Sequence, residues 1–273
     1  MADRKAFIVG ISGASSSGKT TLARLLRDVF PSTFVLHEDD FYKPDAEIPT
    51  KDGLADWDCA EAISIPDMTR ALAYIRENGT FPPFVDSKED QNSVGACPVP
   101  DAAIQAAKSK VASWTAPGQP GHAILVSSSS SSSSSSSKPL RICILDGFLL
   151  YSPEMEAGGV TNLLDTKMFL LVSHESVVQR RERRDGYVTL DGFWKDPPGY
   201  VDKIVWPNYV EAHAGLFEGG DVEGKLDEGI LKEKSILAQT GEGLDVDMTT
   251  TFNWAVDTLI RQLEEFAGKE GER

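Results

Sequence analysis

The chain has 273 residues, of which 41% are hydrophobic, and a formal net charge of -15 at pH 7. That length allows one large domain or two small ones, and the apolar fraction is enough for a sizeable buried core. An acidic chain is a poor partner for nucleic acid or for an anionic membrane surface, so we expect neither. The three cysteines, Cys59, Cys97 and Cys143, are far apart, which argues against a disulfide framework or a zinc site.

The N-terminus does not have the pattern of a signal peptide, because residues 1–5 lead directly into an apolar run. No apolar run approaches the roughly 20 residues that a membrane-spanning helix needs. We therefore expect a cytoplasmic protein, with the nucleus as a second location. The sequence leaves the oligomeric state open, and we favour a monomer.

Four strand-like runs alternate with helical patterns along the chain. The expected strands are residues 6–11, 33–37, 140–145 and 167–172. Apolar residues recur at helical spacing directly after the first strand, at 67–78 and at 250–266. This alternation predicts an α/β fold with a mostly parallel sheet that helices cover on both faces.

The stretch from about residue 85 to residue 138 differs in composition from the rest. It is rich in Pro, Gly, Ser and Asp, and residues 127–137 are eleven consecutive serines. Polyserine has no apolar surface that would offset the entropy lost on ordering. We therefore expect a single domain over 1–273 with a disordered insertion at about 85–138, in which a helical patch at 102–114 survives. A phosphorylated regulatory loop is the alternative.

A glycine-rich turn separates the first strand from the first helix. It has the spacing Gly-x-x-x-x-Gly-Lys-Thr of a phosphate-binding P-loop. Its glycines let the backbone approach a ligand, whose phosphates the N–H groups and the helix dipole then hold. Lys19 reaches the β- and γ-phosphates, and the Thr20 hydroxyl binds Mg²⁺. The sequence thus predicts ATP with Mg²⁺ on Gly13, Ala14, Ser15, Ser16, Ser17, Gly18, Lys19, Thr20 and Thr21.

Acidic residues follow two of the other strands. Asp39 and Asp40 come after the second strand, and Asp146 comes after the third. Ligands of open parallel sheets lie beyond these strand ends. Phosphoryl transfer to an alcohol needs one carboxylate to accept the hydroxyl proton and others to hold Mg²⁺. Either Asp39 or Asp146 fits the base, and we favour Asp39 because Asp40 can share the metal shell. The alternatives are an acidic helix N-cap and a strand-end residue without chemistry.

Two further stretches carry candidate chemistry. The arginine run at 180–184 predicts a lid helix-loop that closes over phosphates, and its alternative is a solvated basic face. Trp57 and Asp58 place an aromatic ring beside a carboxylate. This pair suits a nucleoside, since the ring stacks on the base and the acid accepts the ribose hydroxyls. A core tryptophan beside a helix-capping acid is equally compatible.

Taken together, these stretches resemble the nicotinamide riboside kinases, a branch of the uridine-kinase-like P-loop kinases. The resemblance lies in residues 10–23, 39–44, 146–150, the arginine run and 198–209. It spans most of the chain except the insertion. The P-loop and the arginines occur in many small-molecule kinases, whereas 39–44 and 198–209 are much more specific. The resemblance implies a single P-loop kinase domain of the P-loop NTPase fold, with a lid helix-loop.

The same resemblance implies ATP- and Mg²⁺-dependent phosphorylation of the 5′-hydroxyl of nicotinamide riboside, which yields nicotinamide mononucleotide for NAD synthesis. Thr20, Asp39 and Asp146 would serve the metal, and Asp39 would also accept the proton. The implied nucleoside contacts are Asp39, Asp40, Phe41, Tyr42, Trp57, Asp58, Arg181 and Tyr187. Of these, Trp57 would stack on nicotinamide opposite Tyr187, and Asp58 would bind the ribose diol. Arg180 and Arg184 would contact ATP.

Three features depart from the family pattern. Asp146 stands where relatives carry Glu, which makes direct base chemistry from that position less favourable. The spacing up to Tyr187 differs by one residue, and the insertion has no counterpart in compact members. A uridine/cytidine kinase remains the nearest rival. A catalytically silent ATP-binding protein that uses the insertion for docking is the rival of another class, although nucleotide binding alone does not need all these acids and arginines.

Overall fold

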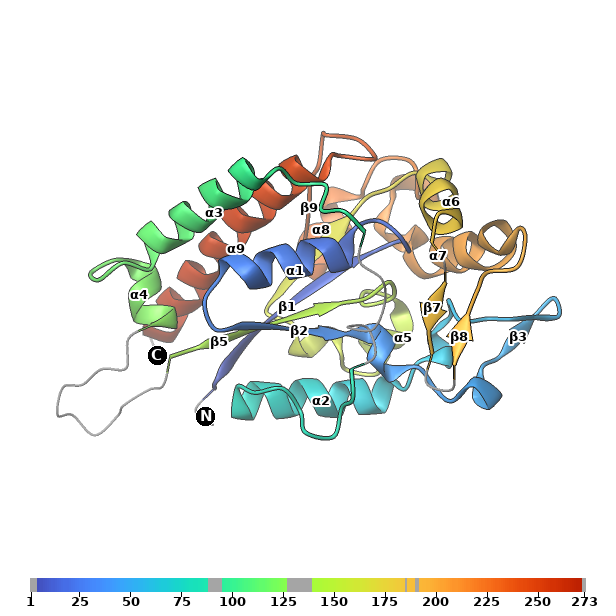
Figure 1. The fold of residues 1–273 in the computed structure, drawn as a ribbon, viewed down its shortest axis with the longest axis horizontal. Coiled ribbons are helices and arrows are strands. Elements are labelled where there is room, and N and C mark those ends of the chain that lie inside the picture. The colour runs from blue at the N-terminus through green and yellow to red at the C-terminus, as the bar shows by residue number, and fades with distance from the viewer. Residues whose placement is uncertain (1–3, 88–94, 127–138, 185, 190–191, 272–273) are drawn as a thin grey trace.

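A five-stranded parallel sheet forms the centre of the molecule, in the order β2-β5-β1-β6-β9 (Figure 1). The computed structural model describes residues 4–87, 95–126, 139–184, 186–189 and 192–271. The strands of the sheet are β1 (Ala6–Gly13), β2 (Thr33–His37), β5 (Arg141–Asp146), β6 (Thr166–Leu170) and β9 (Ile236–Ala238). The four predicted strands are confirmed, with ends that differ by one or two residues. β9 was not predicted, because three residues are too few to show a period.

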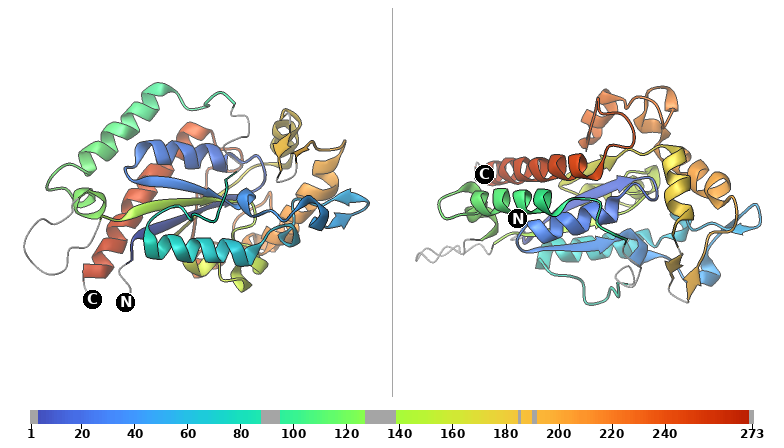
Figure 2. Two further views of the ribbon diagram at one scale, coloured as in Figure 1. Left: turned by 60° about the horizontal axis from the view of Figure 1, so that its bottom comes forward. Right: turned by 45° about the horizontal axis from the view of Figure 1, so that its top comes forward.

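Helices cover both faces of this sheet, as predicted (Figures 1 and 2). All eight residues of β1 are buried, and they alternate between two apolar clusters. Ala6 and Ile8 pack toward α2 (Ile65–Asn78) and α5 (Pro153–Ala157), whereas Phe7 and Val9 pack toward the opposite face. The helices of that opposite face are α1 (Lys19–Val29), α3 (Asp101–Trp114), α4 (Pro120–Leu125) and α9 (Met248–Gly271).

Much of the expected insertion is folded, so a disordered stretch over 85–138 was too broad an expectation. The predicted patch at 102–114 forms α3, and α4 follows it. Val111 and Leu125 are buried against α1 and α9, and Trp114 Nε1 donates to Glu264 Oε1 at 2.8 Å. These few apolar side chains bury enough surface to stabilise the two helices, which the polar overall composition of the stretch did not indicate. The polyserine run lies outside the described residues.

The remaining elements gather at the carboxyl edge of the sheet, at the end of the molecule opposite the termini (Figure 2). Two small hairpins stand there, β3 (Thr50–Lys51) with β4 (Leu54–Ala55), and β7 (Tyr187–Val188) with β8 (Phe193–Trp194). α6 (His174–Glu182) and α7 (Trp206–His213) flank the second hairpin, and α8 (Glu228–Lys234) precedes β9. Within the described ranges, no helix has both the length and the apolar character needed to cross a membrane.

His213, at the end of α7, is a fully buried titratable group in the core. Its ring stacks on Phe169 of β6, with 5.4 Å between centroids, and its Nδ1 donates to Tyr209 O at 3.0 Å. Burial lowers the pKa of His213 to about 4, from an ordinary 6.5. The folded protein therefore holds this imidazole neutral where the unfolded chain would protonate it.

We expect His213 to weaken the fold as the pH falls. In the unfolded chain His213 is protonated below about pH 6.5, whereas in the folded protein it stays neutral down to about pH 4. The contribution of neutral His213 to the free energy of unfolding is therefore complete above pH 6.5 and is lost progressively as the pH falls below it. Between pH 7.5 and pH 5.0 this loss is about 2 kcal/mol. Urea unfolding of the wild type and of His213→Phe at both pH values measures it. An equal pH dependence in the two proteins would contradict the assignment.

Candidate active site

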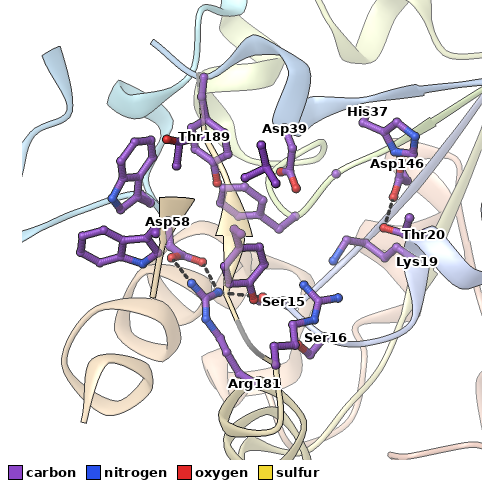
Figure 3. A pocket seen from close by; sticks show the side chains of 18 of the residues that line it. Ser15, Ser16, Lys19, Thr20, His37, Asp39, Asp58, Asp146, Arg181 and Thr189 are labelled. Carbon is purple, nitrogen blue, oxygen red and sulfur yellow. Dashed lines mark hydrogen bonds and ion pairs between the residues drawn. The ribbon is translucent and has the colours of Figure 1, made fainter. Parts of the chain in front are cut away.

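One pocket opens beyond the carboxyl ends of β1, β2 and β5 (Figure 3). Segments that are far apart in sequence line it: the P-loop, the end of β2, the turn after β5, the stretch 57–58, the end of α6 and the β7–β8 hairpin. Lys19 and Asp39 line this same pocket, on facing segments. The structure thus brings together the turn, the acids and the arginines that the sequence placed in separate stretches.

The P-loop has the backbone of an anion cradle. Gly13 has φ +147°, and a Cβ there would lie 2.5 Å from Leu170 O, so only glycine fits. Gly18 has φ +98°, and Ser16 adopts φ 60°, a left-handed conformation that costs a non-glycine residue of order 1–3 kcal/mol. The buried hydroxyl of Ser16, which lines the pocket, has no hydrogen-bond partner among the described residues. Buried polar groups of this kind are normally satisfied, which points to a ligand with acceptor oxygens.

Lys19, the first residue of α1, lies folded over the P-loop. Its Nζ donates to Ala14 O at 2.8 Å, and its side chain is buried. Burial lowers the pKa of Lys19 to about 8, although Asp146 and Asp39 oppose the shift. A cation whose charge is only partly compensated in a buried site favours the arrival of a phosphate.

A short chain of polar contacts joins α1, β5 and β2. Thr20 Oγ1 donates to Asp146 Oδ2 at 2.5 Å, and His37 Nδ1 lies 2.5 Å from Asp146 Oδ1. Burial opposes the charge of Asp146, but His37, Thr20 and Lys19 together hold its pKa below the usual range. Both carboxylate oxygens are therefore engaged and ionised, which suits an organising group better than a proton acceptor. The sequence analysis did not single out His37.

Asp39 stands on the 3₁₀ turn Glu38–Phe41 that follows β2. Asp39 and Tyr42 line the pocket, whereas Asp40 and Phe41 do not, and Phe41 is buried in the core. The expected ribose contact of Phe41 therefore has no support in this arrangement. Sequence reasoning passed over Glu38, which is fully buried and whose Oε2 accepts from Leu149 N at 3.2 Å. Burial and the neighbouring Asp39 raise the pKa of Glu38 to about 8.

The donors near Thr20 suit a hard cation, because hydroxyl and carboxylate oxygens are the ligands that Mg²⁺ prefers. Thr20, Asp39 and Asp146 all line the pocket. Across the described ranges, no three or more His, Cys, Asp or Glu side chains gather in a group that could hold a metal by themselves. A protein contribution of few ligands is typical of Mg²⁺, which keeps several waters and takes substrate phosphate oxygens.

Arg181, near the end of α6, connects three parts of the pocket. Its guanidinium donates to both oxygens of Asp58, at 2.8 and 2.9 Å, and to Ser15 Oγ at 2.7 Å (Figure 3). It also donates to Asp196 at 2.6 Å. Burial opposes its charge, but Asp58 and Asp196 raise the pKa of Arg181 well above the usual value. Its neighbour Arg180 donates to Ser16 O at 3.2 Å from outside the pocket lining. Asp196 is a residue that the sequence analysis missed.

The aromatic side chains differ from the expected clamp. Trp57 contacts Tyr42 and Trp194, with ring centroids 5.4 and 5.8 Å away. Tyr187 lies instead under the guanidinium groups of Arg181 and Arg184, at 5.1 and 5.0 Å. The ring that faces Trp57 in this structure is Trp194, and the clamp role expected of Tyr187, which also lines the pocket, stays a prediction. The pairing of β7 with β8 brings Trp194 back to the pocket, and two-residue strands carry no sequence signal of pairing.

Among curated relatives, the nicotinamide riboside kinase of Schizosaccharomyces pombe is 36% identical over 261 residues, which cover 96% of this chain and 99% of that protein. This chain belongs to the nicotinamide riboside kinase family. The Saccharomyces cerevisiae member is 30% identical over 96% of this chain and 98% of its own length. Human nicotinamide riboside kinase 1 is 28% identical over 76% of this chain and 76% of its own length.

A scan against family models found no match. Among solved structures, thymidylate kinase from Candida albicans aligns with a TM-score of 0.36 at 12% identity, over 95% of this chain and 94% of that one. That likeness is too weak to bear on the assignment. In this member of the nicotinamide riboside kinase family, the P-loop lines one end of the pocket. Trp57 and Asp58 form the wall at the other end, and Asp39 also lines the pocket.

Proposed function

We propose that this chain transfers the γ-phosphoryl group of ATP to the 5′-hydroxyl of nicotinamide riboside and releases nicotinamide mononucleotide, a step of NAD salvage. One observation carries this proposal: Lys19, Asp39 and the Trp57–Asp58 pair line a single pocket, in a chain of this family. The partner is then a small nucleoside. A bound Mg²⁺ would neutralise charge on the β- and γ-phosphates and align them.

On the phosphate side, the P-loop N–H groups and Lys19 hold the triphosphate. The Thr20 hydroxyl and Asp146, which contact each other at 2.5 Å, would hold the metal or its waters. Arg184 lines the pocket and Arg180 lies against Ser16, so both can meet phosphate charge that develops during transfer. α6 and the arginines thus act as a lid that also excludes water.

Asp39 serves as the proton acceptor. It follows β2 at the edge of the sheet where the phosphates are held, and it lies close enough to Lys19 and Glu38 to shift the pKa of each. Asp146 is less suited, because Thr20 and His37 engage both its oxygens. A carboxylate within reach of the 5′-hydroxyl removes the proton as the oxygen attacks phosphorus.

The nucleoside lies against Trp57 and Asp58. Asp58 accepts the ribose hydroxyls, with Arg181 alongside as donor, and Trp194 forms the second aromatic wall. The nicotinamide ring of the riboside carries a positive charge, whereas uracil is neutral. Aromatic faces attract cations by about 0.5–2 kcal/mol, which favours the pyridinium nucleoside over uridine. The ring centroids of Trp57 and Trp194 are 5.8 Å apart, and a small outward movement of the two side chains makes room for the nicotinamide ring between them.

A side-by-side assay of ATP-dependent turnover tests the function. We expect kcat/KM for nicotinamide riboside to exceed that for uridine, with nicotinamide mononucleotide as the product. A higher kcat/KM for uridine would make the chain a uridine kinase. Absence of turnover with every ribonucleoside, while ATP still binds, would favour the catalytically silent protein.

Asp39→Ala should lower kcat by at least about two orders of magnitude while ATP still binds, because the proton acceptor is lost and the P-loop is intact. Single-turnover kinetics and ATP titration measure the two effects. Glu47→Ala is the matched control, since Glu47 is an exposed acid a few residues further along the same segment. Unchanged turnover of Asp39→Ala would exclude Asp39 as the base.

Trp194→Ala should raise KM for nicotinamide riboside by about fivefold to a hundredfold, the range of one lost aromatic stack, and leave KM for ATP unchanged. Phe193→Ala is the control, because Phe193 is the neighbouring residue of β8 and 62% exposed. Equal nucleoside KM values for the two variants would remove Trp194 from the binding wall.

A further inference from the structure

Residues 198–209, one of the two most family-specific stretches of the sequence, contribute no side chain to the pocket lining. It forms a π-helical turn, Val201–Val205, that continues into α7. Val201, Ile204 and Val205 are buried in the same apolar cluster as Trp57. Two polar side chains of this stretch, Tyr200 and Asn208, are also buried, and both form hydrogen bonds with residues 55–57.

Tyr200 is bonded to the backbone on both sides of Asp56. Its hydroxyl donates to Ala55 O at 2.9 Å and accepts from Trp57 N at 3.0 Å. A phenol has one proton to donate, and this arrangement uses both its donor and its acceptor capacity. The ring is 1% exposed, contacts Trp194 at 5.6 Å and lies 5.5 Å from the Arg181 guanidinium carbon. Tyr200 therefore contacts the backbone that carries Trp57 as well as the Trp194 and Arg181 side chains beside it.

Asn208 binds Asp56, the residue between Ala55 and Trp57. Its Nδ2 donates to both oxygens of Asp56, at 2.8 and 3.0 Å, and its Oδ1 accepts from Lys51 Nζ at 2.7 Å. Asp56 Oδ1 in turn accepts from Asp58 N at 3.1 Å. The segment that carries Trp57 and Asp58 is thus hydrogen-bonded through the backbone of Ala55 and Trp57 and through the side chain of Asp56.

The π-helical turn explains how one helix presents both groups. Along an ideal α-helix, residues 200 and 208 would differ by about 80° in direction. Trp206 N instead bonds to Val201 O, five residues back, so the turn holds one extra residue and brings the two positions nearly onto one face. Pro207 accounts for the wide turn, since it has no N–H and its ring would clash with the carbonyl of Lys203. The Val-Trp-Pro-Asn sequence therefore sets the helix geometry that places Tyr200 and Asn208 on one face.

We propose that Tyr200 and Asn208 are positioning residues for nucleoside recognition: they hold the backbone of residues 55–58 so that Trp57 and Asp58 meet the substrate, and they touch neither substrate nor ATP. This inference rests on the proposed function for the identity of the nucleoside. The stretch 198–209 would thus support the nucleoside site although none of its side chains lines the pocket.

Tyr200→Phe keeps the ring and removes the hydroxyl, which leaves the buried Trp57 N–H without its partner. We expect KM for nicotinamide riboside, and Kd from quenching of tryptophan fluorescence, to rise about tenfold, with KM for ATP and kcat within about twofold of wild type. Tyr209→Phe is the matched control, because the Tyr209 hydroxyl is buried on the same helix and has no partner among the described residues. It should change none of these values.

A second pair of variants tests the Asn208 link. Asn208→Asp places a carboxylate against Asp56 and should raise the nucleoside Kd more than Asn208→Ser, which keeps a donor. A Tyr200→Phe protein with wild-type nucleoside KM and Kd would overturn the proposal. So would equal losses in nucleoside and ATP affinity with a lowered melting temperature, since those indicate general structural damage.

The two proposals fail in different ways. A wild-type protein that binds nicotinamide riboside but does not phosphorylate it overturns the proposed function, and the Kd values of the variants still decide whether Tyr200 and Asn208 position the wall. A wild-type protein that phosphorylates it, with variants that bind as well as wild type, overturns the positioning alone. A wild-type protein that binds no ribonucleoside overturns both.

Discussion

The buried guanidinium of Arg181 is the contact on which the arrangement of the pocket depends. It joins the P-loop through Ser15, the nucleoside wall through Asp58 and the segment after the β7–β8 hairpin through Asp196. A buried charge is costly unless its geometry is good and its hydrogen bonds are satisfied, and here two carboxylates and a hydroxyl satisfy it. Removal of one partner would leave uncompensated charge at the centre of the site. The P-loop and the Trp57–Asp58 segment are therefore linked by Arg181.

The pocket wall formed by Trp57 and Asp58 is supported from two directions. Arg181 binds the Asp58 side chain from the pocket side, and Tyr200 and Asn208 bind the backbone and Asp56 from behind. Such support matters because a misplacement of about 1 Å at a binding group can cost two orders of magnitude in rate. Arg181 and Trp194 share this support, since the Tyr200 ring contacts both side chains.

Local sequence was enough wherever a group and its neighbours are close together in the chain. The P-loop, Asp39, Asp146 and Arg181 were all predicted and all stand at one edge of the sheet, because parallel strands and their following turns meet there. Trp194, Asp196, Tyr200 and His37 were missed, and each reaches the site through a partner more than ten residues away or through a two-residue strand. Trp194 comes to face Trp57 only through the β7–β8 hairpin, and spacing along a chain does not show how a hairpin folds back.

The order of strand-like and helical segments, the glycine turn and the strand-end acids are properties of short stretches, so the sequence by itself determined the α/β fold class and the phosphate end of the pocket. The other end of the pocket, around Trp57 and Trp194, was decided only by tertiary structure. Its walls come from residues 42, 57–58, 181 and 194, which are held by buried ion pairs and by the wide helical turn before α7. Long-range pairing and burial set such contacts, and neither leaves a periodic trace in the sequence.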